Sequence, residues 1–173
     1  DRSPSRGLGD VYKRQGMSVT FHREKVPLGT GGALWNARER LEERFILVWG
    51  DDLHPIDYEP LMEKHRSQQA PMTMTITEAH SDSNLQHDGE LLLDYDKRTK
   101  DSSKLNGYEA GTSVVEKSTL LKHGKDGEWS WEEAVYPALA GQARVHVDNT
   151  KFWDMGTPEG LALLEEFLDK TTL

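Results

Sequence analysis

The segment from Pro27 to Asp52 constrains the fold of this chain more than any other part of the sequence. It reads PLGTGGALWNARERLEERFILVWGDD, so a glycine-rich turn leads through a helical pattern and an apolar run to two carboxylates. The continuous apolar run from Phe45 to Trp49 predicts a strand that is buried on both faces of a parallel sheet. Ligands of open α/β sheets lie beyond the carboxyl ends of such strands, which makes Asp51 a candidate magnesium ligand. The pattern indicates an α/β enzyme that handles a phosphorylated ligand.

Composition narrows the classes of function. The 173 residues suffice for one domain with a sizeable core, and the absence of cysteine excludes disulfides, thiolate metal sites and cysteine nucleophiles. No apolar run is long enough to span a membrane, and we expect a cytoplasmic protein without a membrane partner. The net charge of −9 argues against broad nucleic-acid binding. A nucleotide stays compatible with this charge, because a metal and a few local donors can meet its phosphates.

The first 15 residues, DRSPSRGLGDVYKRQ, show no amphipathic period, no signal-peptide core and no helix cap. Ser5 to Gln15 resemble the translation of a sequencing-library adaptor, and the alternative is a disordered basic tail. We therefore assign residues 1–15 to a non-native, adaptor-like, disordered tail and residues 16–173 to the folded domain. On this interpretation we expect that the polypeptide has lost its natural beginning.

The rest of the sequence predicts alternating strands and helices. Strands are expected at 17–22, 45–49, 72–77, 91–93, 108–115 and 143–147, and helices at 33–45, after Asp57, at 131–139 and after Thr157. Residues 80–90 and 122–130 are expected to be loops. The last helix has the clearest start, because Thr157 can cap it, Pro158 suits its first position and Glu159 complements its dipole.

Two motifs are candidates for ligand contact. In PLGTGG, exposed N–H groups and missing side chains allow a ligand to approach the backbone closely; the alternative is a tight strand–helix connection without a ligand. In WDMGTPE, Asp154 by itself is most simply a turn or capping acid. Because Asp51 and Asp154 lie at comparable element ends, we hypothesise that they converge on one cation. The histidines show no metal-binding spacing.

Five motifs in a fixed order resemble the sugar-1-phosphate nucleotidylyltransferases: PLGTGGAL, FILVWGDD, YEAGTSVV, WSWEEAVYPALA and FWDMGTPEGL. The resemblance runs from about Gly16 to the end of the chain, with the mannose- or heptose-1-phosphate guanylyltransferase type as the closest-looking branch. It implies the C-terminal two thirds of a Rossmann-like, glycosyltransferase-A-like three-layer α/β domain, with a mixed, mostly parallel sheet that lacks its first strands. It also implies transfer of a nucleoside monophosphate from a nucleoside triphosphate to a sugar 1-phosphate, with Mg²⁺ as the cofactor. The oligomeric state stays open.

The resemblance implies roles on the nucleotide and metal side of the site. Asp51 and Asp154 match the two aspartates that hold magnesium, and both are predicted catalytic residues. The turn that contacts nucleobase and ribose matches Leu28, Gly29, Thr30, Gly31 and Gly32.

On the sugar side, the resemblance matches Gly111 to the glycine that lines the sugar pocket and Glu132 to the acid that binds sugar hydroxyls. Lys97 matches the catalytic lysine that meets the sugar phosphate. Without the resemblance, Glu132 reads as a solvent-facing helix acid and Lys97 as part of an exposed loop. Two departures put details in doubt: Lys97 lacks the usual Glu-Lys-Pro context, and Ala134 replaces a second acid.

The signature Gly-x-Gly-Thr-Arg-Leu loop of the family, which cradles the triphosphate, does not occur in this sequence. We therefore expect an N-terminally truncated and inactive enzyme. An alternative is a non-catalytic nucleotide-sugar-binding or regulatory subunit that lacks this loop. A third reading keeps only the α/β fold and treats the likeness as an accident of glycines and acids.

Overall fold

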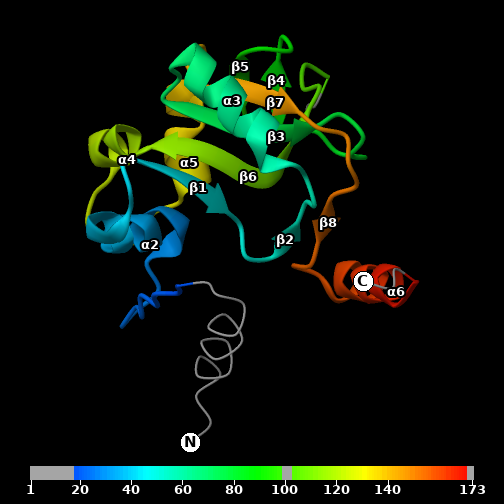
Figure 1. Cartoon of the computed structure of the whole chain (residues 1–173), viewed down its shortest axis with the longest axis horizontal. Coiled ribbons are helices and arrows are strands. Elements are labelled where there is room, and N and C mark those ends of the chain that lie inside the picture. Colours follow the sequence, from blue (N-terminus) through cyan, green and yellow to red (C-terminus); the bar gives the residue numbers. More distant parts are fainter. Residues whose placement is uncertain (1–17, 99–102, 171–173) are drawn as a thin grey trace, which may run out of the picture.

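A four-stranded mixed sheet in the order β1-β6-β3-β7 forms the centre of the computed structural model, which describes residues 18–98 and 103–170 (Figure 1). The strands are β1 (Arg44–Val48), β6 (Tyr108–Glu116), β3 (Met72–Thr77) and β7 (Arg144–Val147). β6 runs antiparallel to β1 and β3, whereas β3 and β7 are parallel, so three of the strands share one direction. The predicted mixed α/β fold is confirmed, as are these four strands.

Helices cover both faces of the sheet and give three layers. They are α2 (Gly29–Ala37) with the 3-10 turn η1 (Arg38–Arg40), α3 (Tyr58–Gln68), α4 (Lys117–His123) and α5 (Trp131–Val135) with the 3-10 turn η2 (Pro137–Leu139). α3 begins as predicted, because Asp57 Oδ1 accepts a hydrogen bond from Glu59 N at 3.0 Å. The predicted helix at 131–139 is confirmed as α5 and η2, whereas α4 was not expected.

The sequence of β3 shows why both faces of the sheet are buried. Met72 and Met74 belong to the large core that also contains Trp131 of α5. On the opposite face, the hydroxyl of Thr73 lies 2.9 Å from Nδ1 of His65 in α3. Every residue of β3 is therefore buried, although apolar and polar residues alternate along it.

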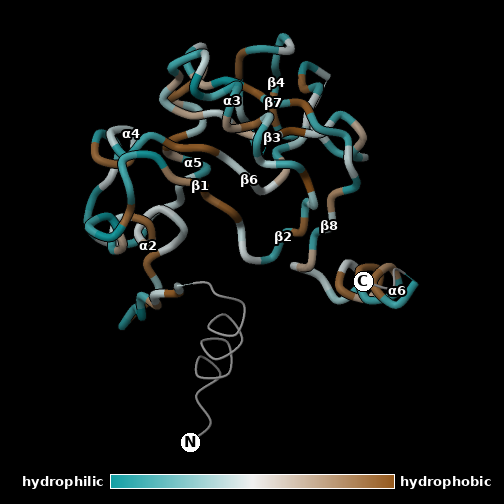
Figure 2. The backbone as a smooth tube through the Cα atoms, viewed as in Figure 1, coloured by the Kyte–Doolittle hydropathy of each residue, from teal (hydrophilic) through white to brown (hydrophobic). Residues whose placement is uncertain are grey.

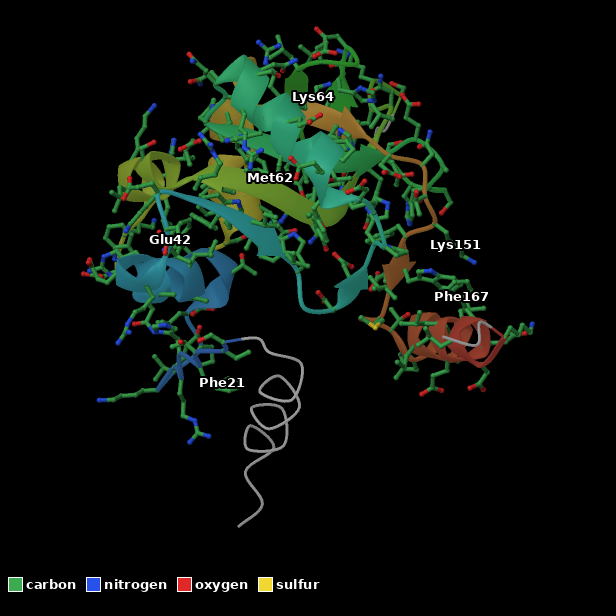
Figure 3. The ribbon with its side chains drawn as sticks, in the orientation of Figure 1. Phe21, Glu42, Met62, Lys64, Lys151 and Phe167 are labelled. Atoms are coloured by element: carbon green, nitrogen blue, oxygen red, sulfur yellow. The ribbon has the colours of Figure 1, made fainter. Side chains whose placement is uncertain are left out.

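β1 differs from the expectation of a strand buried on both faces. It lies at the end of the described sheet, pairs only with β6, and leaves Ile46 and Val48 40% and 46% exposed. Figure 2 shows that β1 is nevertheless a hydrophobic segment of the chain. The predicted strand at 17–22 is wrong for residues 18–22, which have no sheet edge beside them; Phe21 is exposed beyond α2 (Figure 3). A strand needs a hydrogen-bonding neighbour, and an apolar pattern alone does not supply one.

Two further predictions need correction. The helix expected over 33–45 begins earlier, at Gly29, and ends at Ala37, because the chain turns at η1 and Leu41 is extended. The loop expected over 80–90 contains β4 (Leu85–His87), which pairs antiparallel with β5 (Leu92–Tyr95).

The C-terminal part crosses back to the end of β1. β2 (Asp52–Leu53) pairs antiparallel with β8 (Trp153–Asp154), which places Asp52 opposite Asp154. α6 (Pro158–Lys170) starts as predicted, with Thr157 Oγ1 accepting a hydrogen bond from Gly160 N at 3.0 Å. α6 packs on β8 through the Trp153 and Phe167 rings, whose centroids are 4.8 Å apart (Figures 1 and 3).

None of the helices in the described ranges combines the length and the apolar character needed to cross a bilayer. The predicted tail at residues 1–15 lies outside the described residues.

Candidate functional site

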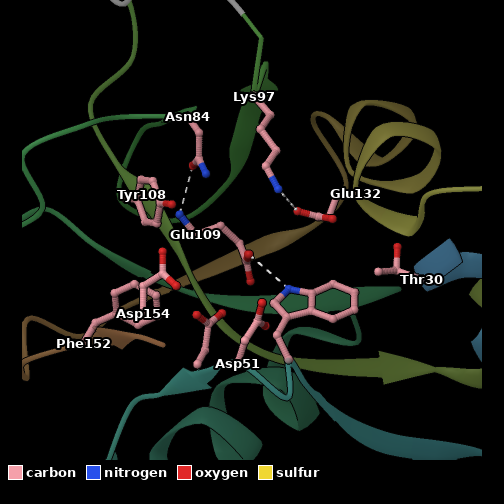
Figure 4. A pocket seen from close by; sticks show the side chains of 11 residues that line it. Thr30, Asp51, Asn84, Lys97, Tyr108, Glu109, Glu132, Phe152 and Asp154 are labelled. Carbon is pink, nitrogen blue, oxygen red and sulfur yellow. Dashed lines mark hydrogen bonds and ion pairs between the residues drawn. The ribbon is translucent and has the colours of Figure 1, made fainter. Parts of the chain in front are cut away.

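A pocket of about 180 Å³ lies where the carboxyl end of β1 meets the beginning of β6 (Figure 4). The two ends lie at one edge of the sheet because β6 runs antiparallel to β1. The pocket is lined by Thr30, Trp49, Asp51, Asp52, Asn84, Lys97, Tyr108, Glu109, Glu132, Phe152 and Asp154. These residues come from distant parts of the sequence, so the pocket is a product of the tertiary fold.

The structure brings five of the predicted site residues to this pocket: Thr30, Asp51, Lys97, Glu132 and Asp154. It does not place Leu28, Gly29, Gly31 or Gly111 among the lining residues. The roles of all these residues stay predictions, but the metal and sugar-phosphate residues lie together as the hypothesis requires.

The glycine-rich first turn of α2 is packed against the protein itself. Gly31 N donates a hydrogen bond to Trp129 O at 3.0 Å, and Trp129 N donates to Leu28 O at 3.0 Å. A Cβ on Gly31 would lie 2.2 Å from Cε3 of the Trp129 indole. Packing against Trp129 therefore explains why a glycine occupies position 31. Thr30, by contrast, reaches the pocket while its hydroxyl accepts a hydrogen bond from Trp131 N at 2.9 Å.

The turn between β8 and α6 brings two carboxylates together. Asp51 O accepts a hydrogen bond from Met155 N at 2.7 Å, and Asp154 Oδ1 accepts one from Gly156 N at 2.7 Å. A Cβ on Gly156 would lie 3.0 Å from Asp154 Oδ1 and 3.5 Å from Asp51 Oδ2. Both carboxylates thus border one small space, and their convergence on a cation stays a prediction.

This arrangement fits magnesium bound together with a substrate. Mg²⁺ is commonly held by one or two carboxylates, with substrate phosphates and waters as its other ligands. Asp51 and Asp154 supply two such carboxylates. In the part of the chain that the structure describes, no three His, Asp or Glu side chains could hold a metal by themselves. The donor set therefore suits a cation that a phosphate completes.

Asp52 adds a third carboxylate to the lining of the same pocket. Its Oδ2 lies 2.4 Å from the position that a Cβ would take on Gly111, so the glycine permits the close approach. Burial, and then the charges of Asp51 and Asp154, raise the pKa of Asp52 to about 7.

Glu109 is the buried acid of the pocket, with 6% of its surface exposed. Its Oε1 accepts a hydrogen bond from Gly111 N at 3.0 Å, and its Oε2 accepts one from Trp49 Nε1 at 3.2 Å (Figure 4). Burial, and then the charges of Asp52 and Glu132, raise the pKa of Glu109 to about 8. The protein therefore favours a protonated Glu109 near neutral pH.

Lys97 is the sole cation among the described residues that line the pocket. Its Nζ donates a hydrogen bond to Glu132 Oε1 at 2.8 Å, and this bond raises the pKa of Lys97. Acidic residues outnumber it in the lining, so a phosphorylated ligand needs an additional cation to enter.

Sequence reasoning missed Trp49, Asp52, Asn84, Tyr108, Glu109 and Phe152. All of them except Asn84 lie within three residues of Asp51, Gly111 or Asp154. A search of the neighbours of each predicted residue would therefore have found them. Asn84 carries no such signal, because it lies in a polar segment far from any motif.

Comparison with known proteins finds related sugar-phosphate enzymes. No family model matches the chain. The mannose-1-phosphate guanylyltransferase of Mycobacterium tuberculosis is 28% identical over 153 residues, which cover 83% of this chain and 42% of that protein. The D-glycero-alpha-D-manno-heptose 1-phosphate guanylyltransferase of Aneurinibacillus thermoaerophilus is 36% identical over 70 residues, covering 40% of this chain and 30% of that protein.

The chain is thus similar to sugar-1-phosphate guanylyltransferases, which supports the sugar-phosphate nucleotidyltransferase family. It spans less than half the length of these two curated relatives, with 42% and 30% of them covered.

Solved structures agree with this family in fold. HddC from Yersinia pseudotuberculosis has a TM-score of 0.72 at 23% identity and covers 93% of this chain and 73% of its own. A putative glucose-1-phosphate thymidylyltransferase from Bacillus anthracis has a TM-score of 0.79 at 15% identity, with 96% and 74% covered. At these identities the likeness shows the fold alone.

Proposed function

We propose that this site serves nucleotidyl transfer to a sugar 1-phosphate. A phosphate oxygen of the sugar 1-phosphate attacks the α-phosphorus of a nucleoside triphosphate. The bond from that phosphorus to the oxygen that bridges to the β-phosphorus breaks, and pyrophosphate leaves with its electron pair. Mannose or heptose 1-phosphate with GTP are the first substrates to test, because the two curated relatives are named for guanylyl transfer to such sugars.

The observation that carries the proposal is the convergence of Asp51 and Asp154 opposite Lys97 in one pocket. The two carboxylates would hold Mg²⁺ together with phosphate oxygens. When bound, Mg²⁺ would supply Lewis-acid stabilisation of the charge that develops on the phosphates. Lys97 would bind the sugar phosphate and reduce the repulsion between two anionic substrates. No covalent nucleophile is required, since the protein aligns the reactants and stabilises charge.

On the sugar side, the pocket offers groups that suit hydroxyls. Glu132 accepts hydrogen bonds, and Asn84 and Tyr108 line the same wall. The indole N–H of Trp49 fixes the carboxyl of Glu109, which keeps this wall ordered before a ligand arrives.

One observation favours the binding or regulatory alternative as a second candidate. The lining contains Lys97 as its single cation among the described residues, whereas a triphosphate needs several donors around its leaving group. A protein with this pocket alone would bind a sugar phosphate or a nucleotide sugar without turning it over. The assay below separates the two candidates.

Turnover is measured by incubating the 173-residue chain with Mg²⁺, GTP and mannose or heptose 1-phosphate, and by following pyrophosphate release and the nucleotide sugar by mass spectrometry. If the chain turns over, Asp51→Asn and Asp154→Asn should each lower turnover by about 100-fold or more, because each removes a ligand charge from the metal. Asp82→Asn, the same change in an exposed loop, should leave turnover unchanged.

Titration calorimetry with the same sugar 1-phosphates and Mg²⁺ completes the test. Binding without turnover would support the non-catalytic candidate. If both Asp51→Asn and Asp154→Asn turn over at the wild-type rate, the two carboxylates do not hold the catalytic metal. The absence of both binding and turnover would overturn the proposal.

A further inference from the structure

Two neighbouring ion pairs join the segment after β5 to the first turn of α5. Lys97 Nζ lies 2.8 Å from Glu132 Oε1, and Arg98 Nη2 pairs with Glu133 Oε1. Consecutive cations thus meet consecutive acids across the same gap. Lys97 and Glu132 line the pocket, whereas Arg98 and Glu133 border a second hollow outside it (Figure 4 shows the inner pair).

The helix side of this gap is firmly anchored. Trp131 has no exposed surface, and its backbone N–H donates to Thr30 Oγ1 at 2.9 Å. Ser130 caps the helix by accepting a hydrogen bond from Glu133 N at 3.3 Å. Glu132 and Glu133 therefore project from a fixed platform.

The strand side is held less tightly. Asp96 N donates to Asn84 O at 2.9 Å, and Arg98 N donates to Asp96 Oδ1 at 2.9 Å. These bonds fix the backbone up to Arg98, but Lys97 has a long flexible stem and a half-exposed side chain. The segment also contains no proline that would fix its backbone. The position of the Lys97 ammonium thus depends on what holds the segment against α5.

We propose that Arg98 and Glu133 form a clasp that positions Lys97 against Glu132 at the rim of the pocket. Both members of the clasp are positioning residues, because they lie outside the pocket and act through Lys97. The clasp keeps the Lys97 ammonium beside the pocket. There an incoming phosphate group can replace Glu132 as its ion-pair partner. This inference deepens the proposed function, on which it depends for the role of Lys97, but it is tested without turnover.

A purely electrostatic influence of the outer pair makes a different prediction. Removing the positive charge of Arg98 would raise the pKa of Lys97, whereas removing the negative charge of Glu133 would lower it. An amine is acylated only in its neutral form, so charge alone predicts slower acylation of Lys97 in Arg98→Gln and faster acylation in Glu133→Gln. Loss of a clasp predicts faster acylation in both, because Lys97 leaves Glu132 in either variant.

The experiment measures the acylation rate of each lysine in the intact chain, with a small amine-reactive reagent and peptide mass spectrometry. Exposed ion pairs are weak, so we expect Lys97 to react about two- to fivefold faster in both Arg98→Gln and Glu133→Gln. The charge-reversed double variant, Arg98→Glu with Glu133→Arg, should restore the wild-type rate. Lys64, which pairs with Glu90 elsewhere, is the internal reference and should not change.

A matched control removes a similar exposed pair that does not touch the pocket. Arg66→Gln breaks the Arg66–Glu59 pair of α3 and should leave the acylation of Lys97 unchanged. Thermal midpoints should stay equal across the variants, which excludes unfolding as the cause. Opposite effects of Arg98→Gln and Glu133→Gln, an unchanged Lys97, or failure of the double variant to restore the rate would each overturn the clasp.

The outcome is separate from the fate of the proposed function. If the wild-type chain neither binds nor converts a sugar 1-phosphate, the labelling result still decides whether the clasp positions Lys97. If turnover is present, loss of the clasp should raise the KM for the sugar 1-phosphate and leave the KM for the nucleotide unchanged. An equal rise in both KM values would contradict the assignment of Lys97 to the sugar phosphate.

Discussion

Two helix entrances in this molecule look alike in sequence and differ in what they face. At the start of α2, Gly31 is covered by the indole ring of Trp129. At the start of α6, Gly156 borders the carboxylates of Asp154 and Asp51. The first entrance is a packing joint and the second opens on the acidic pocket. A glycine at the start of a helix therefore indicates close approach, but not what approaches.

The difference has energetic consequences. The α2 entrance depends on shape, since its contacts are an aromatic ring and neutral backbone groups. The α6 entrance and the adjoining pocket wall gather Asp51, Asp52, Glu109 and Asp154. We expect a change of side-chain volume to alter stability at the α2 entrance. At the α6 entrance, we expect stability to depend on pH and on the concentration of cations.

Gly31→Ala tests the packing joint and has the largest expected effect. The added methyl would overlap the indole of Trp129, which cannot swing away easily because its Nε1 donates to Lys125 O at 2.9 Å. We expect the free energy of unfolding in urea to fall by about 1–3 kcal/mol. Gly50→Ala is the control, since nothing lies within 4 Å of a Cβ there. Equal stability of the two variants would show that the joint is not tightly packed.

Glu109→Gln tests the response of the pocket wall to protons. The folded protein raises the pKa of Glu109 from 4.5 to about 8, so it binds this proton more tightly than the unfolded chain does. Stability from this group is full below pH 4.5 and declines as the pH rises to about 8. Glutamine stays neutral, and its Oε1 can accept one of the two hydrogen bonds, whereas its Nε2 cannot accept the other. We expect the stability of Glu109→Gln relative to the wild type to rise by about 1–2 kcal/mol between pH 4 and pH 8.5.

The measurement is urea unfolding at a series of pH values. Glu63→Gln, on the exposed face of α3, provides the control and should shift stability equally at both ends of the range. A Glu109→Gln protein that loses stability as steeply as the wild type would mean that other carboxyls, with Asp52 first among them, dominate the pH dependence.

Gly156→Ala has the smallest expected effect on stability, within about 0.5 kcal/mol, because its methyl meets only movable carboxylates. It should weaken Mg²⁺ binding by about two- to tenfold, since the Asp154 carboxylate, with Oδ1 3.0 Å from the added methyl, must shift. Calorimetric titration with Mg²⁺ measures this. Gly31→Ala should show the reverse pattern, with lower stability and unchanged Mg²⁺ affinity. If both variants behave alike, the two entrances do not differ as the structure indicates.

Local signals were sufficient for several parts of the fold. Asp57 and Thr157 cap helices as predicted, because a cap depends on residues only a few positions away. The alternating pattern of 72–77 likewise gave a strand, although its threonines proved to be buried, with Thr73 against His65 of α3. The predictions failed where a strand needs a neighbouring strand. Residues 18–22 have a strand pattern, but no sheet edge lies beside them.

The same distinction applies to the site. Asp51, Lys97, Glu132 and Asp154 were predicted from motifs in the sequence, and all four line the pocket. Glu109 was not predicted, although it lies two residues before Gly111, and only the structure shows that Trp49 and Gly111 both donate to its carboxyl.

The sequence by itself determined the main strands, the starts of α3 and α6 and the family resemblance, all of which depend on short-range chemistry and motif order. Only the tertiary structure decided that Trp129 fills the glycine turn, that Asp51 and Asp154 border one space, and that Arg98 and Glu133 pair beside Lys97. The physical reason is that these contacts join residues far apart along the chain, and burial, charge and close approach act between neighbours in space.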